Sequence, residues 1–122
     1  SLQLDDGSEF MFYQIRDKVG RGDLAGHGVL LSPGGIKTLL HAQDVQIDIK
    51  RYWRSPSSGV RYPAAWQIHI PQHDLELSIA PRFNDQEWRK NFTYWEGAVA
   101  VSGMARGIPI SGKGYVELVG YD

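Results

Sequence analysis

The sequence predicts an all-β domain whose antiparallel strands form a barrel or a sandwich. Short segments alternate apolar and polar residues, turn residues separate them at regular intervals, and no long amphipathic helix is present. Fourteen glycines and six prolines, with four tryptophans and six tyrosines, suit short strands joined by tight turns. We therefore expect about eight to nine strands and at most one short helical turn.

The N-terminal part begins with a predicted β-hairpin. Its arms are residues 2–4 and 10–16, and the Asp-Gly pair between them is typical of a tight turn. Residues 17–28 hold four glycines and several charges, so we expect a surface loop there. Two further strands are expected at residues 29–31 and 36–41.

The middle of the chain carries the clearest alternation. Residues 45–54 alternate as a half-buried antiparallel strand does, and residues 55–59 form a turn by composition. The alternation resumes over 60–70, where Pro63 predicts that the strand starts at an edge or a bulge. A further strand is expected at 75–79.

The C-terminal part holds the longest predicted strand, residues 92–103. Before it, residues 84–88 resemble a helical turn capped by an Asn or Asp side chain. After it, residues 105–110 and 114–121 are the expected arms of a last hairpin.

The composition excludes several classes of protein. The 122 residues are enough for one domain with a modest core. Thirteen basic and 14 acidic residues leave no net field to attract nucleic acid or an anionic membrane, so neither partner is expected. The lack of cysteine excludes disulfides and thiolate sites, and the four histidines have no metal-ligand spacing, so we expect no metal. No phosphate- or dinucleotide-binding motif is present, so no cofactor is expected.

Glu96 is the residue that stands out most. It is the one formal charge within residues 92–103, and it shares a strand face with Tyr94 and small residues. A carboxylate among apolar neighbours must pair, lose its charge or take part in chemistry. Two interpretations follow: a salt-bridged structural residue at a barrel rim, or a proton donor or ligand anchor in a cavity.

Several stretches together form a recognisable pattern: residues 1–8 with 12–16, 52–59 with 61–63 and Trp66, 85–87, 94–99 with Gly103, and 114–121. In this order and spacing they resemble the carotenoid 1,2-hydratase (hydroxyneurosporene synthase) family, also called AttH-like or predicted secreted hydrolases. The resemblance covers nearly the whole chain.

The resemblance implies a lipocalin-like antiparallel β-barrel over residues 1–122. Family members are several times longer and carry two such barrels, and this chain matches the second, so a missing N-terminal barrel is an expected partner. The start at Ser1 without methionine also suggests a truncated or processed chain. A homodimer is a further possibility, because removing a partner domain exposes an apolar face. The family implies a secreted or periplasmic location.

The resemblance also implies a chemistry. Relatives hydrate isolated double bonds of carotenoids or isoflavonoids, and fungal members catalyse cycloadditions, so the implied ligand is a hydrophobic isoprenoid- or polyketide-like molecule. The family's Tyr-x-acid pair falls on Tyr94 and Glu96, where the hydratases usually carry Asp as the acid proposed to protonate the alkene. We expect Tyr94 to hydrogen-bond Glu96 or the attacking water. Trp95, on the other face of the strand, is expected to pack against the missing barrel.

Three aromatic residues, Trp53, Tyr62 and Trp66, are candidates to line the ligand pocket, with core packing as the alternative. A family Asp-His-x-Trp segment lies upstream of Ser1, so this chain alone is not expected to be active. Three functions therefore stay open: an acid-assisted hydration or cyclisation domain with Glu96 as proton donor, a non-catalytic binding domain for an apolar ligand, and a purely architectural domain.

Overall fold

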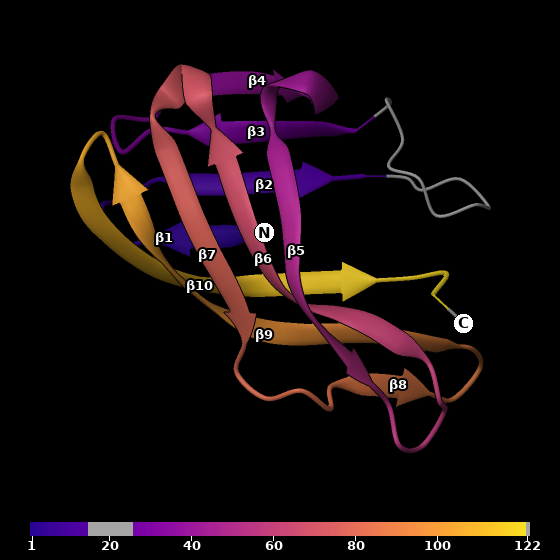
Figure 1. The fold of residues 1–122 in the computed structure, drawn as a ribbon. Coiled ribbons are helices and arrows are strands. Elements are labelled where there is room, and N and C mark those ends of the chain that lie inside the picture. The colour runs from indigo at the N-terminus through magenta and orange to yellow at the C-terminus, as the bar shows by residue number, and fades with distance from the viewer. Residues whose placement is uncertain (15–25, 122) are drawn as a thin grey trace.

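The computed structural model describes residues 1–14 and 26–121, which form one strongly curved antiparallel sheet of ten strands (Figure 1). The strands are β1 (Leu2–Leu4), β2 (Glu9–Tyr13), β3 (His27–Leu31), β4 (Lys37–His41), β5 (Gln46–Arg54), β6 (Arg61–Ile70), β7 (Leu75–Pro81), β8 (Glu87–Arg89), β9 (Thr93–Ala105) and β10 (Ile108–Leu118). Two 3-10 turns, η1 (Ala42–Asp44) and η2 (Pro71–His73), follow β4 and β6. None of the helical segments in this described part is long or apolar enough to span a bilayer.

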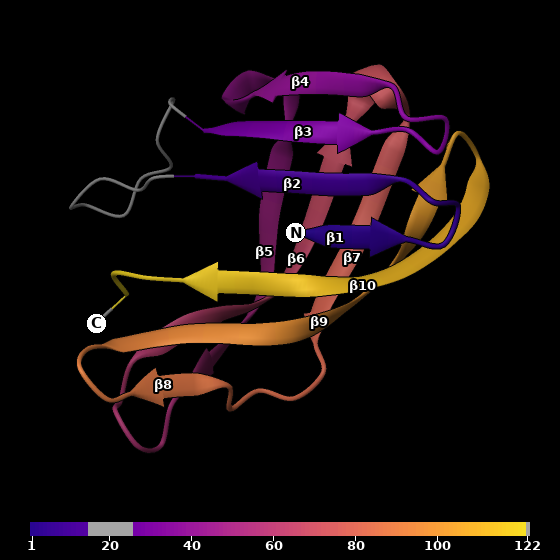
Figure 2. The same ribbon diagram turned by 180° about the vertical axis from the view of Figure 1, so that it is seen from behind.

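The strand order is β4-β3-β2-β1-β10-β9-β7-β6-β5, with β8 added beside β9. The sheet curls so that β5, β6 and β7 lie across β1 to β4 (Figures 1 and 2). The predicted all-β, lipocalin-like barrel class is confirmed, because the strands form one continuous curled sheet. β4 and β5, the two edge strands, do not pair with each other, so the barrel is open between them. The predicted loop falls mostly outside the described residues, since positions 15–25 are not described.

The core fills the space between the two halves of the curled sheet. Alternate residues of each strand point into it, among them Phe10, Ile70, Leu77 and Val99, each at most 3% exposed. Trp95 is also buried, and its indole nitrogen donates to the Asn84 carbonyl over 2.7 Å. The expectation that Trp95 packs against a missing domain was therefore wrong, because this face of β9 is the core face.

The segment expected to form a helical turn is extended instead and ends in strand β8. Its Gln86 side chain accepts a hydrogen bond from the Ala98 backbone nitrogen at 2.8 Å and donates to the Ala98 carbonyl at 3.1 Å. Gly97 makes this possible, because a Cβ there would lie 2.4 Å from the Gln86 amide carbon. A side-chain amide thus takes the place of a strand neighbour beside β9.

The last hairpin also differs from the prediction. Strands β9 and β10 run as far as the turn at Arg106 and Gly107, so the expected turn at residues 111–113 lies inside β10. The glycines of this stretch serve a close backbone approach: a Cβ on Gly112 would lie 2.2 Å from the Gln3 carbonyl oxygen of β1. β1 therefore packs tightly against β10 and joins the two ends of the chain.

Candidate functional site

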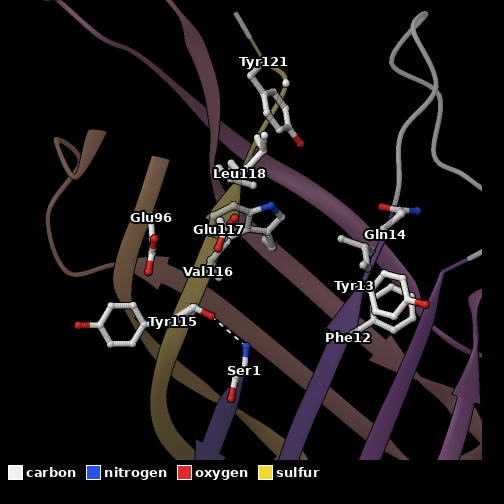
Figure 3. A pocket seen from close by; sticks show the side chains of 14 residues that line it. Ser1, Phe12, Tyr13, Gln14, Glu96, Tyr115, Val116, Glu117, Leu118 and Tyr121 are labelled. Atoms are coloured by element: carbon white, nitrogen blue, oxygen red, sulfur yellow. Dashed lines mark hydrogen bonds between the residues drawn. The ribbon is translucent and has the colours of Figure 1, made fainter. Parts of the chain in front are cut away.

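A cavity of about 760 Å³ opens at the end of the barrel where β2 and β10 finish (Figure 3). β1 pairs with both neighbours as far as Leu2, which lies opposite Phe10 on one side and Gly114 on the other. Beyond this point β2 continues to Tyr13 and β10 to Leu118, and no described strand lies between them.

The inner wall of the cavity is apolar. Side chains from four strands and the C-terminal segment contribute to it, namely Phe12, Ile47, Trp66, Val116, Leu118 and Tyr121. Trp66 was one of the three candidate ligand-binding residues, and it is only 8% exposed. A wall of this composition suits a hydrophobic ligand.

The rim of the cavity carries the acidic groups. Glu96 of β9 and Glu117 of β10 are strand partners directly opposite each other, and both line the cavity together with Tyr115. Figure 3 shows Glu96 and Tyr115 on the opposite side of β10 from Phe12 and Gln14. Trp95 and Leu118, the neighbours of Glu96 and Glu117 in sequence, face the core and are 1% and 8% exposed. Because side chains alternate along a strand, the carboxylates lie on the outer face of the sheet, at the edge of the opening rather than in the barrel interior.

Tyr94 lies two residues before Glu96 on the same face of β9, and it is not among the residues that line the cavity. Loss of solvent raises the pKa of Tyr94, and the charge of Glu96, their hydrogen bond and the charge of Glu117 raise it further. Tyr94 therefore keeps its proton at neutral pH and can donate a hydrogen bond to Glu96. No described residue forms an ion pair with Glu96, so a salt-bridged structural role finds no partner within the described part of the chain.

Tyr62 and Trp53, the other two candidate ligand-binding residues, are not part of the cavity wall. Tyr62 is 1% exposed in the core, where its ring stacks on Trp53 with 6.2 Å between centroids. Tyr62 also contacts Tyr121, at 6.0 Å between centroids, and Tyr121 does line the cavity. The structure therefore brings Glu96 and Trp66 to one cavity, whereas Tyr62 and Trp53 pack against each other away from its wall.

Glu87 is a buried carboxylate that the sequence did not reveal. Its side chain is fully shielded from solvent and accepts hydrogen bonds from Ser55 and Ser58 at 2.6 Å, and from Tyr62 and Arg89 at 2.7 Å. Burial alone raises the pKa of such a group, but the four donors outweigh it and lower the pKa of Glu87 to about 2. Glu87 is therefore ionised at neutral pH and cannot act as a proton donor. Its partners in the 55–58 turn lie about 30 residues earlier in the sequence.

Metal binding finds no support within the described residues, because no three His, Asp or Glu side chains there are placed to hold an ion.

The comparisons with known proteins agree on one family. The family model described as AttH-like matches residues 1–121. A candidate AttH protein from Nitrosomonas europaea superposes with a TM-score of 0.82 at 34% sequence identity, over 98% of this chain and 36% of that one. Kievitone hydratase from Nectria haematococca superposes with a TM-score of 0.72 at 21% identity, over 97% of this chain and 37% of that one, which shows a shared fold.

No curated protein sequence matches the chain. The chain spans little more than a third of either solved structure. With a family match over nearly all of its residues, and a structural relative that is 34% identical, the chain belongs to the AttH-like family.

Proposed function

We propose that the chain is a barrel domain of a hydratase-like enzyme that acts on a hydrophobic isoprenoid- or polyketide-like molecule, with Glu96 as the proton donor. One observation carries the proposal: Glu96 lies on the rim of a cavity whose inner wall is apolar, beside Tyr94 and with no cationic partner among the described residues. Kievitone hydratase shares the fold and supports the reaction class.

The reaction needs an acid and then a base. The carboxyl form of Glu96, in which the repulsion from the Glu117 carboxylate is absent, transfers its proton to one alkene carbon, and the double-bond electrons form the new C–H bond, which leaves a carbocation on the other carbon. Water adds to that cation and must lose a proton. Glu117, the strand partner of Glu96, offers a second carboxylate to accept it. Tyr94 orients Glu96 through their hydrogen bond, and nearby tyrosine rings favour the cation by about 0.5–2 kcal/mol each.

The proposed activity belongs to a whole protein, because the chain spans only 36–37% of the solved relatives. We propose a preceding barrel as the partner that covers the outer face of β9 and β10, with self-association of this chain as the alternative. The secreted or periplasmic location likewise stays a prediction from the family.

The test is Glu96→Gln in the full-length protein, assayed against a panel of carotenoids and isoflavonoids. Turnover is expected to fall by roughly 10²–10⁴-fold, because a general acid is lost, while ligand affinity changes by less than about twofold. Glu9→Gln, an exposed residue of β2 outside the cavity wall, is the matched control and should leave both unchanged. Undiminished turnover in Glu96→Gln would remove Glu96 from the proposal.

The second candidate is a binding domain without chemistry, which the apolar inner wall favours. In that case no substrate of the panel is turned over, and Glu96→Gln alters only affinity, while loss of the Trp66 ring weakens binding. A purely architectural domain would show neither effect.

A further inference from the structure

A second, smaller cavity of about 100 Å³ lies at the other end of the barrel. The turns that join β1 to β2, β3 to β4, and β9 to β10 meet at this end, away from the C-terminus (Figures 1 and 2). Its polar lining comes from these turns, from β4 and from η2, and consists of Asp6, Ser8, Ser32, Thr38, His73 and Arg106. Nothing in the proposed hydration uses these residues.

The cavity holds one negative and one positive side chain. Asp6 accepts two hydrogen bonds from Ser8, one from its backbone nitrogen at 2.8 Å and one from its hydroxyl at 2.5 Å. Burial acts to raise the pKa of Asp6, but these bonds and the charge of Arg106 lower it, so Asp6 is ionised at neutral pH. The two charges leave the lining locally neutral, which favours neither an anion nor a cation.

Further hydrogen-bonding groups remain available. The Ser32 hydroxyl oxygen accepts a bond from the Ile36 nitrogen at 3.0 Å, which leaves its own hydrogen to donate. Thr38 makes no hydrogen bond through its side chain to any residue that the structure describes. Leu30, Leu75 and Ala105 add apolar surface to the same cavity. The cavity therefore offers donors, an acceptor and an apolar backing together.

The backbone beside the cavity is held in an unfavourable conformation. Arg106 has φ +50° and Asp74 has φ +47°, both in the left-handed region that residues with a Cβ rarely adopt. The Arg106 nitrogen donates to the Asp74 carbonyl at 2.8 Å, so the two strained residues are joined. Asparagine and glycine suit such a hairpin turn far better than arginine. Strained residues of this kind cluster at ligand-binding sites, so the position of Arg106 is consistent with a role in binding.

We propose that this cavity binds a vicinal diol, the shared feature of a small polyol and of one edge of a sugar ring. One hydroxyl donates to Asp6 and accepts from Arg106, and its neighbour meets the hydroxyls of Thr38 and Ser32. The carbon atoms lie against the apolar backing. The volume of about 100 Å³ equals roughly three water molecules, which suits a two- or three-carbon fragment.

The experiment is a ¹H–¹⁵N NMR titration of the protein with 1,2-propanediol and with 1,3-propanediol. Saturable shifts at the amides of Ser8, Thr38 and Arg106 are expected, with the 1,3-isomer at least about tenfold weaker because its hydroxyls are not adjacent. Glycerol and methyl α-D-mannopyranoside then distinguish a free polyol from a sugar by which binds more tightly.

Two variants keep the test independent of folding. Arg106→Asn removes the guanidinium but suits the left-handed turn, so the fold is retained and 1,2-propanediol is expected to bind at least about tenfold more weakly. Asp74→Gly relieves the linked strain without altering the cavity lining, so binding should stay the same. Equal responses to the two isomers, full binding by Arg106→Asn, or stronger shifts of the same amides with inorganic phosphate would each overturn the proposal.

Discussion

Glu96 and Glu117 face each other directly across the β9–β10 pair, on the outer face of the sheet at the rim of the large cavity. Like charges in this arrangement repel and reduce the stability of a strand pair. Neither carboxylate forms an ion pair with a described residue. An arrangement that costs stability without a structural return is typical of a site retained for function.

Replacing Glu117 by lysine should therefore stabilise the fold. Glu117→Lys turns the repulsion into a cross-strand attraction, and we expect the free energy of unfolding to rise by about 0.2–1 kcal/mol. Urea denaturation at low and high salt checks this, because screening should shrink the gain. Glu9→Lys, on a different strand, is the control. A loss of stability in Glu117→Lys would mean that the two carboxylates are not in repulsive contact.

Removing the Glu87 carboxylate should destabilise the fold. Glu87→Gln leaves one oxygen acceptor for four donors, so the free energy of unfolding is expected to fall by about 1–3 kcal/mol. Asp85→Asn is the matched control, since it breaks only an exposed 3.7 Å pair with Arg89 and should cost less than about 0.5 kcal/mol. Equal losses of unfolding free energy in the two variants, measured by chemical denaturation, would contradict a stabilising role for the hydrogen bonds to Glu87.

The same carboxylate should make stability depend on pH. The pKa of Glu87 is about 2 in the folded protein against an ordinary value of 4.5, so the unfolded chain binds the proton more tightly. The stabilisation is therefore complete above about pH 4.5 and is lost as the pH falls from 4.5 towards 2. The gap in unfolding free energy between the wild type and Glu87→Gln should narrow over this range. A gap that stays constant down to pH 3 would contradict the assignment.

Substitutions of Trp66 and Tyr62, two aromatic residues of β6, should have different effects on ligand binding and on stability. Trp66 lines the cavity, so Trp66→Phe is expected to weaken binding of the apolar dye 8-anilinonaphthalene-1-sulfonate several-fold. Tyr62→Phe removes the hydroxyl that donates to Glu87 at 2.7 Å, so it should lower the free energy of unfolding by about 1–2 kcal/mol and leave dye binding unchanged. Fluorescence titration and denaturation measure the two effects. Weaker dye binding in Tyr62→Phe alone would place the ligand elsewhere.

The fold class was readable from the sequence because alternation and turn residues act locally. Residues 45–54 and 75–79 form strands close to where the pattern placed them. The errors occur where a distant contact decides the structure. β8 is extended because Gln86 reaches β9 across Gly97, and residues 111–113 stay in a strand because β1 packs on Gly112. Neither contact leaves a local signal.

The candidate site shows the same division. Glu96 was visible because a single charge in an apolar strand is locally anomalous, and its position on the same face as Tyr94 followed from strand alternation. Glu87 was missed, because three of its four donors come from a turn and from a strand that are far away in the sequence. Tyr62 remained a candidate both for a ligand pocket and for core packing, because an aromatic residue looks the same in a core and in a cavity wall.

The pairing of β1 with β10 sets an order for folding. Leu2 pairs with Gly114, so a strand made at the start of this segment finds its partner only when almost all of the segment has been synthesised. Contacts between such distant residues form slowly, because a long chain must be closed first. Leu2 and Leu4, which are buried in the finished barrel, therefore lack one of the two strand neighbours of β1 on the ribosome until β10 emerges. We expect the pairing of β1 with β10 to be a late step of folding, and a truncation within β10 to leave these leucines more exposed.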